Sequence, residues 1–442
     1  MMNRITHKLI CGAALLALTG CGLFGGGDKK NTPTLGNRVA ILGAESDAVV
    51  DPALATVPVV LPAAVANSDW AQPGGNAAKN LGQLALTADL APAWTARISG
   101  ASNRARLAAA PVVSGGRLYA IDTDGMVRAF DAATGGAAWS TSMAVSGDGR
   151  TSAFGGGVAA DGAMVYATNG VGDVAALDAA SGAEKWRVRP AGPMRGAPTI
   201  SNNNVYVMTQ DNQIFALDPA DGSTNWNKSG TVGQSGIFGV AAPSAAQGTV
   251  IAGYSTGELA AYRYENGQDL WTDALSRTSI STSVSSLTDI DADPVIDRGR
   301  VYAIGQGGRM AAYELITGQR IWEINIAGIA TPVVAGDWVF VLTDDAKLLA
   351  VARTTGKIRW VAQLPEYRKP KKKEDPIDWK GPVLAGGRLI VASTRGGVWS
   401  VDPEEGTAAQ LFDLGESVSV PPIVANQTLY LLDDSGRISA YR

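Results

Sequence analysis

The sequence contains very little histidine and cysteine. His7 is the only histidine, and Cys11 and Cys21 are the only cysteines among 442 residues. All three lie within the first 21 residues. The rest of the chain therefore cannot supply a His-dependent triad, a cysteine nucleophile, a His or Cys metal site, or an internal disulfide. We expect no catalytic residue, no cofactor and no bound metal, and hence a protein that is not an enzyme.

The chain also lacks an excess of basic residues. It has 37 Lys and Arg against 41 Asp and Glu, a net charge of −4. This balance argues against a nucleic-acid partner. Apolar residues make up 46% of the chain, enough for a packed core, while 53 glycines indicate many tight turns. The composition therefore predicts an all-β protein.

The N-terminal residues have the pattern of an export signal. Arg4, His7 and Lys8 precede an apolar run over residues 9–18, which is too short to span a bilayer. The run ends in Leu18-Thr19-Gly20-Cys21, which resembles the bacterial lipoprotein box, although an ordinary signal peptide with a chance cysteine is the alternative. We predict a signal peptide over residues 1–20, lipidation of Cys21, and a flexible tether over residues 21–68 that attaches the chain to a membrane.

A repeat of about 45 residues fills the remainder of the chain. Seven tryptophans recur at this spacing, six of them four residues after a glycine: Trp94, Trp139, Trp186, Trp226, Trp271, Trp322 and Trp360. A seventh copy of the turn that precedes these six tryptophans, from Asp402 to Gly406, has Gln410 in place of the tryptophan. We interpret the tryptophans as packing residues between repeats rather than as a cofactor site.

Each repeat predicts four antiparallel strands. Apolar runs that begin with proline and end at glycine, such as residues 111–115, precede alternating runs such as residues 117–121, and short polar turns with glycine follow. A four-stranded unit of this length is typical of one propeller blade. Residues 69–442 then form an eight-bladed β-propeller. Its last blade combines three C-terminal strands with one N-terminal strand after Trp94, which closes the ring.

The repeat Ala-Leu-Asp-x-x-x-Gly-x-x-x-Trp resembles the quinoprotein (PQQ-like) propeller repeat. Together with the lipoprotein box, the eight blades and the segment Asp69–Asn76, the chain resembles the outer-membrane protein assembly lipoproteins of that repeat family. The resemblance implies a lipid-anchored scaffold on the periplasmic side of the outer membrane. Its partners would be the periplasmic domains of the β-barrel insertase and unfolded outer-membrane proteins, whose delivery and insertion it would assist.

The same resemblance implies two partner-binding segments. The first is an Asp-x-Asp-x-x-Pro segment before one blade, which matches Asp289, Asp291 and Pro294. The second is an apolar residue followed by arginine before another blade. Here the matching place is Ile237-Phe238, where the apolar residue is kept and the arginine is lost.

Two other functions stay open from the sequence. A PQQ-dependent dehydrogenase would share the repeat, but such enzymes use a vicinal cysteine pair, which this chain lacks after Cys21. A cell-envelope scaffold or sensor lipoprotein with some other partner is the second alternative.

Three local motifs have two interpretations each. Asp289, Asp291 and Asp293 could suggest a calcium loop, but an EF-hand needs glycine and glutamate where Pro294 and Arg300 stand, so a solvated loop or partner contact is favoured. Residues 170–175 imitate a dinucleotide-binding fingerprint but occupy a hairpin position. The basic run Arg368–Lys373 is either a solvated insertion between blades or an electrostatic contact with acidic headgroups or a partner.

Overall fold

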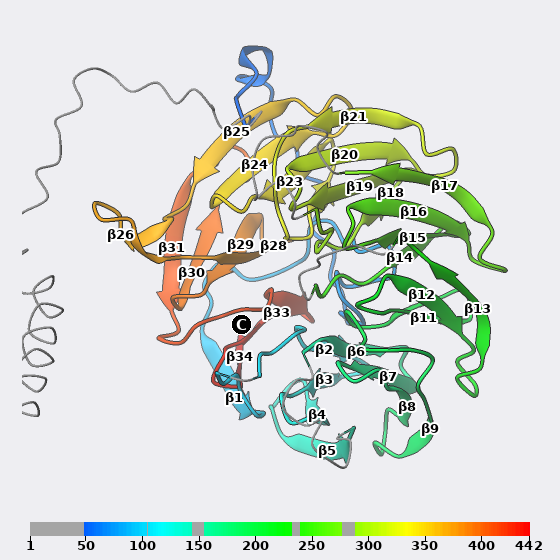
Figure 1. The fold of residues 1–442 in the computed structure, drawn as a ribbon. Helices are drawn as coiled ribbons and strands as arrows, with labels where there is room; N and C mark the ends of the chain where they lie inside the picture. The colour runs from blue at the N-terminus through cyan, green and yellow to red at the C-terminus, as the bar shows by residue number, and fades with distance from the viewer. Residues whose placement is uncertain (1–47, 104, 144–153, 232–238, 276–287) are drawn as a thin grey trace, which may run out of the picture. The chain divides into compact units, whose positions relative to one another are not determined.

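The computed structural model describes residues 48–103, 105–143, 154–231, 239–275 and 288–442. Within these ranges the chain forms eight four-stranded antiparallel sheets and one separate two-stranded hairpin. The sheets follow one another around a ring (Figure 1). This confirms the predicted all-β, eight-bladed propeller.

Blades 1 to 7 run from an innermost to an outermost strand in chain order, whereas the outermost strand of blade 8 is the first strand in the described residues. Blades 1 to 4 consist of β2 (Val112–Ser114), β3 (Arg117–Ile121), β4 (Met126–Asp131) and β5 (Ala137–Ser142); β6 (Gly156–Ala160), β7 (Met164–Asn169), β8 (Val174–Asp178) and β9 (Glu184–Val188); β10 (Thr199–Ser201), β11 (Asn204–Met208), β12 (Gln213–Leu217) and β13 (Thr224–Ser229); and β14 (Ser244–Ala246), β15 (Thr249–Gly253), β16 (Glu258–Arg263) and β17 (Asp269–Ala274).

The second half of the ring repeats the arrangement. Blades 5 to 8 consist of β18 (Val295–Asp297), β19 (Arg300–Gly305), β20 (Arg309–Glu314) and β21 (Arg320–Ile324); β22 (Val333–Ala335), β23 (Trp338–Leu342), β24 (Lys347–Ala352) and β25 (Ile358–Gln363); β28 (Trp379–Ala385), β29 (Arg388–Ser393), β30 (Gly397–Val401) and β31 (Ala408–Asp413); and β32 (Ile423–Ala425), β33 (Thr428–Leu432), β34 (Arg437–Tyr441) and β1 (Pro92–Arg97). Between blades 6 and 7 lie β26 (Tyr367–Lys369) and β27 (Glu374–Pro376), and one 3₁₀ turn, η1 (Pro52–Leu54), precedes the ring.

The hydrophobic core is divided between the blades. Eight clusters of buried side chains lie in the described residues, and each joins two consecutive blades. The cluster between blades 3 and 4, for example, combines Tyr206 and Ile214 with Val250 and Ala260. Because each blade has two faces and both are covered by neighbours, the inner strands are apolar on both sides, with no exposed face. Stability therefore depends on closing the ring.

The repeated tryptophans connect each blade to the next. In all seven cases the indole N–H donates to a backbone carbonyl in the outer turn of the following blade, at 2.8–3.2 Å. Trp226, for instance, donates to Tyr264 O at 2.8 Å, and its ring lies against Gly267. The predicted packing role is confirmed, and the turn that accepts the bond belongs to the next blade.

The eighth blade explains the missing tryptophan. Where Gln410 stands on β31, an indole would face the place where β34 and β1 meet. These two strands come from opposite ends of the sequence and pair antiparallel, with reciprocal backbone hydrogen bonds between Ala91 and Arg442 at 2.7 and 3.0 Å. No outer turn joins them, so an indole at position 410 would have no turn carbonyl and no turn glycine to pack on. Phe412 instead stacks on Tyr441, at 4.5 Å between ring centroids.

A segment before β1 follows the inner edges of the blades around the ring. Residues 67–84, which we call the central segment, hydrogen-bond to the innermost strand region of every blade in ring order, from blade 8 through blades 1 to 7: Asn67 to Val424, Trp70 to Val113, Ala71 to Ala160, Gln72 to Ile200, Ala77 to Ala245, Ala78 to Ile296, Asn80 to Val334 and Leu84 to Leu384. These bonds occupy inner-edge backbone groups that the innermost strands would otherwise leave unpaired. The central segment therefore holds all eight blades from inside.

The described part of the predicted tether also contacts the ring. Asp51 N donates to Ile358 O on β25 at 2.8 Å, and the Asp51 carboxylate pairs with Lys357 at 2.7 Å. Arg359 Nε donates to Val57 O at 2.8 Å. Residues 48–57 thus lie along the outer edge of blade 6. The domain boundary at residue 68 stays a prediction.

The turn glycines give a first testable prediction. Gly267 has φ +69°, and a Cβ there would lie 2.7 Å from the ring of Trp226; Gly387 has φ +72° and open space around it. Gly387→Ala should cost roughly 1–2 kcal/mol for the left-handed backbone alone. Gly267→Ala should cost a further ~1–3 kcal/mol because the methyl group displaces the indole. Urea unfolding of the two variants measures the difference. Equal losses would contradict the packing role of Trp226.

Candidate functional site

The predicted Asp-x-Asp-x-x-Pro segment leads into β18, the innermost strand of blade 5. It does not lie on the open surface. Asp289 is 1% exposed, and the side chain of Asp291 is 10% exposed. Both carboxylates face Arg195, whose side chain is completely buried and comes from the segment before β10 of blade 3.

Arg195 makes three contacts through one nitrogen. Its Nη2 donates to Asp289 Oδ1, to Ile290 O at 2.8 Å and to Asp291 Oδ1 at 3.0 Å. Gly239, before β14 of blade 4, covers the pair so closely that a Cβ would lie 1.9 Å from Asp291 Oδ1. We call Arg195, Gly239, Asp289 and Asp291 the arginine cluster. It joins the segments that lead into blades 3, 4 and 5.

Burial controls the electrostatics of the arginine cluster. Because a carboxylate loses its hydration when buried, burial raises the pKa of Asp289 and raises the pKa of Asp291 to about 6. Repulsion from Asp289 adds to the shift at Asp291. The Arg195 guanidinium opposes both shifts. Arg195 Nε and Nη1 and Asp289 Oδ2 have no hydrogen-bond partner among the described residues. Both buried carboxylates depend on the single Arg195 cation for their stabilisation. Loss of Arg195 would therefore leave buried negative charge without a partner.

A second buried charge pair lies beside the arginine cluster. Asp293 Oδ1 accepts a hydrogen bond from Ala242 N at 2.7 Å, and Lys79 of the central segment donates from Nζ to Thr199 Oγ1 at 2.8 Å. Burial lowers the pKa of Lys79 to about 8, although the negative charge of Asp293 partly opposes the shift. The three aspartates of the suspected calcium loop therefore serve the protein's own cations and backbone. Among the described residues, no group of three or more His, Cys, Asp or Glu could hold a metal ion.

A cavity of about 440 Å³ lies against these groups. It is lined by the central segment and by the innermost strands β2, β22, β28 and β32. Its polar lining includes Lys79, Asp291, Asp293 and Lys380, and Trp70 and Trp379 contribute aromatic surface. Both signs of charge are present, so the lining does not select one simple ion.

Several predicted site residues lie outside the described residues. They are Cys21, Ile237 and Phe238. The partner-binding roles of Ile237, Asp289 and Asp291 stay predictions, as does lipidation of Cys21. The structure does show an apolar residue followed by arginine before a blade, namely Met194-Arg195 before β10, and this arginine contacts both aspartates.

The sequence analysis missed Arg195. The available signal was a single cation in the otherwise small and apolar run Ala191–Thr199. That signal does not identify a partner, because Arg195 and Asp289 are 94 residues apart. Only the ring brings the leading segments of blades 3 and 5 together.

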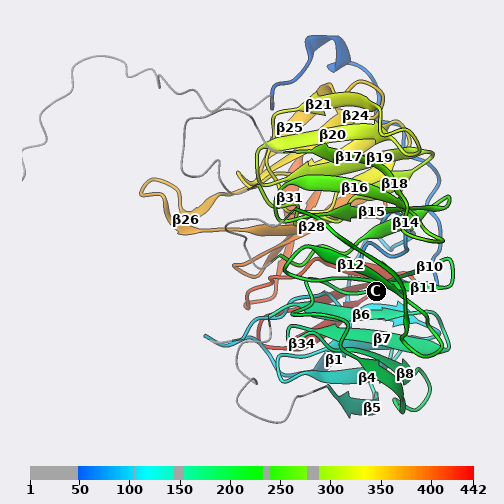
Figure 2. The ribbon, with the colours of Figure 1, turned by 45° about the vertical axis from the view of Figure 1, so that its right-hand side comes forward.

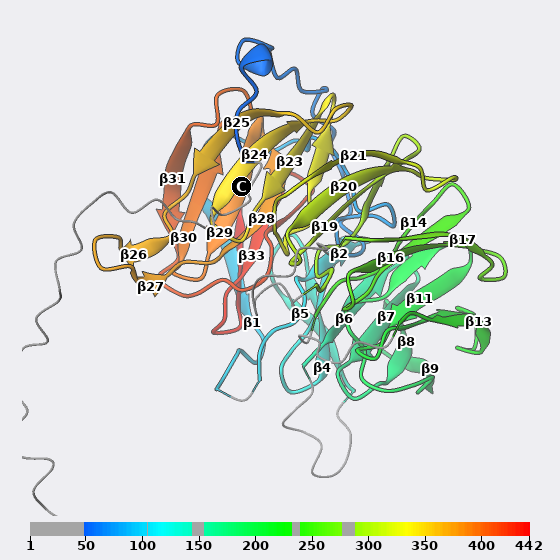
Figure 3. The ribbon, with the colours of Figure 1, turned by 45° about the horizontal axis from the view of Figure 1, so that its top comes forward.

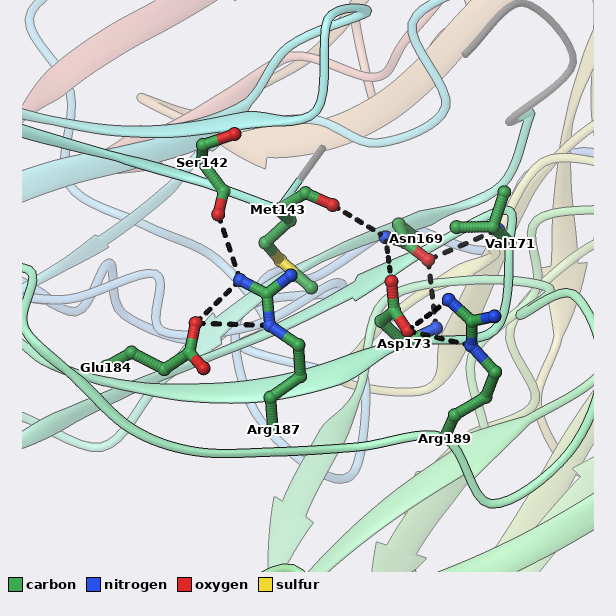
Figure 4. Close-up of polar contacts among 8 residues, drawn as sticks. All are labelled: Ser142, Met143, Asn169, Val171, Asp173, Glu184, Arg187 and Arg189. Atoms are coloured by element: carbon green, nitrogen blue, oxygen red, sulfur yellow. Dashed lines mark hydrogen bonds and ion pairs between the residues drawn. The ribbon is translucent and has the colours of Figure 1, made fainter. Parts of the chain in front are cut away.

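The suspected dinucleotide fingerprint is a hairpin between β7 and β8. Asn169 Oδ1 accepts from Val171 N and Asp173 N at 3.2 and 2.9 Å, and Asn169 Nδ2 donates to Met143 O and Asp173 Oδ2 (Figure 4). Arg189 binds Asp173 Oδ1 at 2.6 Å. A strand follows the glycines where a dinucleotide fold needs a helix, so no helix N-terminus is available for a phosphate.

Fold and site together define a PQQ-like eight-bladed propeller in which buried charges link the segments that lead into neighbouring blades. A family model described as outer membrane protein assembly factor BamB matches residues 82–152 and 123–362. The chain belongs to this BamB family, whose members are outer-membrane protein assembly factors of the cell envelope.

Individual comparisons agree. Outer membrane protein assembly factor BamB of Yersinia pestis is 28% identical over 337 residues, covering 75% of this chain and 83% of the relative. The crystal structure of BamB from Moraxella catarrhalis superposes with a TM-score of 0.69 at 23% identity, covering 80% of this chain and 99% of that chain. A quinohemoprotein alcohol dehydrogenase from Comamonas testosteroni (TM-score 0.65, 14% identity, 86% of this chain and 81% of that chain) shares the fold alone.

Lys79 gives a pH prediction. Its folded-state pKa of about 8 lies below the ~10.4 of an exposed lysine, so the unfolded chain binds more protons between these values. Unfolding free energy of the natural protein should therefore rise with pH across this window, relative to Lys79→Met. Urea unfolding at a series of pH values from 7 to 10 measures the difference. A difference that is constant with pH would show that burial does not lower the pKa of Lys79.

Proposed function

We propose that this protein is a non-enzymatic scaffold lipoprotein of the outer-membrane β-barrel assembly machinery. It is held on the periplasmic side of the outer membrane through Cys21. It binds the periplasmic domains of a BamA-like insertase and assists delivery and insertion of unfolded outer-membrane proteins. Membership of the BamB family supports the general role. The absence of histidine and cysteine after Cys21 supports a non-enzymatic one.

The arginine cluster is the observation that carries the insertase contact. Arg195, Asp289 and Asp291 are buried, so they do not offer free charges to a partner. They fix the relative positions of three leading segments, which come from blades 3, 4 and 5. We infer that these residues are positioning residues and that the segments themselves form the binding surface. Preorganised segments bind more tightly because less conformational freedom is lost on binding.

The same geometry suggests a reassignment of the apolar–arginine pair. We propose that Met194-Arg195 fills this role, because its arginine contacts both aspartates of the other partner-binding segment. Ile237 would then contribute as a neighbour in the segment before blade 4.

Pull-down of purified insertase periplasmic domains tests the proposal. Arg195→Ala should weaken capture at least about tenfold, because two buried carboxylates lose their cation and the leading segments shift. The matched control is Arg353→Ala, which removes another buried arginine. Arg353 Nη2 lies 2.6 Å from Asp297 Oδ2, and this pair is not part of the arginine cluster. It should lose stability but keep capture. Full capture by a folded Arg195→Ala protein, or equal loss in both variants, would contradict the proposed surface.

Membrane attachment has its own test. Cys21→Ala should move the protein from the membrane fraction to the soluble fraction of the cell envelope and should abolish palmitate labelling, because the acylated sulfur is removed. Cys11→Ala is the matched control and should change neither. Continued labelling of the Cys21→Ala protein would disprove lipidation at this residue.

A further inference from the structure

The hairpin β26–β27 is the one pair of strands in the described residues that stands outside the blades. It lies between β25 of blade 6 and β28 of blade 7, with Tyr367 opposite Pro376 and Lys369 opposite Glu374. Figures 1, 2 and 3 all show it projecting away from the ring. The insertion is thus a β-hairpin, residues 367–376, which we call the arm. From the sequence it was either a solvated insertion or an electrostatic contact.

The base of this arm is fixed to the ring. Ile377 N donates to Glu366 O at 2.9 Å, and Trp379 Nε1 donates to Pro365 O at 2.9 Å. Ile377 also packs against the cluster between blades 6 and 7, in which Trp379 is buried. The arm therefore keeps its direction relative to the ring.

The tip of the arm carries unpaired positive charge. All residues from Arg368 to Lys373 are exposed, and five of these six are basic, in a chain whose net charge is −4. Lys369 pairs with Glu374 and Asp375 at 3.4 and 3.5 Å. The other four cations, Arg368 and Lys371–Lys373, have no carboxylate within ion-pair distance among the described residues. The tip is therefore locally cationic.

Distance separates the tip from the acidic ring. Lys373 is four residue steps from Ile377, which packs against the core, and an extended chain rises ~3.3 Å per residue, or at most roughly 13 Å over this stretch. This exceeds the Debye length of ~8 Å at physiological ionic strength. The negative charge of the ring is then largely screened at the tip.

The chemistry of the tip fits a membrane surface better than a protein. Protein interfaces are centred on aromatic and apolar side chains and are poor in lysine. The described exposed large hydrophobic residues lie elsewhere, at residues 49–65, 316 and 321. Clustered lysines without an apolar centre are typical of contact with anionic headgroups.

We propose that residues 368–373 dock on a membrane surface that carries anionic phospholipid headgroups. Acylation of Cys21 is the first attachment to the membrane, and this contact is a second one that orients the ring. The inference goes beyond the proposed function and rests on it only for placing the protein close to a membrane.

Sedimentation with lipid vesicles tests the proposal. The chain from residue 21 with Cys21→Ser, which has no acyl group, is mixed with vesicles of phosphatidylethanolamine and phosphatidylglycerol, or of phosphatidylethanolamine and phosphatidylcholine. It should bind the first and not the second, and added salt should weaken binding. Changing Lys371, Lys372 and Lys373 together to glutamine should lower the partition coefficient by about 100-fold.

A charge-matched control separates the tip from net charge. Lys185, Lys228 and Lys357 are each paired with a carboxylate elsewhere on the ring, and changing these three together to glutamine alters the net charge equally. This control should keep vesicle binding. Equal loss in both triple variants, or equal binding to both vesicle types, would overturn the proposal.

Insertase capture is measured on the same variants. If the tip variant loses capture but keeps vesicle binding, the tip contacts protein and the membrane proposal is wrong. If the natural sequence binds vesicles but captures no insertase, the proposed function fails while this inference stands.

Discussion

The contact between an outer-strand indole and the turn of the next blade is the interaction on which the ring depends. It combines a hydrogen bond from the indole N–H with close packing of the ring on a turn glycine. Because each contact joins consecutive blades, the seven contacts fix seven of the eight junctions. At the eighth junction, between blades 7 and 8, the stack of Phe412 on Tyr441 replaces it, and pairing of β34 with β1 completes blade 8 itself. A propeller blade cannot bury both faces alone, so these junctions are what make the separate sheets one folded unit.

The central segment adds the same constraint from inside. It bonds to the innermost strand regions of all eight blades in ring order. The leading segments of the blades are thereby held in register around the axis. The arginine cluster depends on this register, since Arg195 and Asp289 come from blades separated by a third one. In the proposed function, the segments that these buried charges hold form the surface for another protein, and this role requires no reacting group.

Buried and exposed charges have different uses in this protein. In the arginine cluster the low-dielectric surroundings strengthen each interaction and make every partner necessary. On the hairpin β26–β27, solvated lysines act through a short-range field and contribute independently. The first arrangement fixes shape, and the second attracts an oppositely charged surface. The proposed function uses both, because in it the ring presents one face to a partner while the chain stays close to the bilayer.

The sequence by itself determined the repeat, the number of blades and the closure by both ends, because strand alternation, turn glycines and tryptophan spacing are local patterns. It also identified Asp289 and Asp291 as a motif. The tertiary structure alone decided that Arg195 binds both carboxylates, that the central segment bonds to every blade, and that the basic run is an arm with a fixed base. The first two features join residues far apart in the chain, and only closure of the ring brings such residues within hydrogen-bond distance. The glutamine at position 410 shows both levels: the sequence marks the exception, and the missing turn between β34 and β1 explains it.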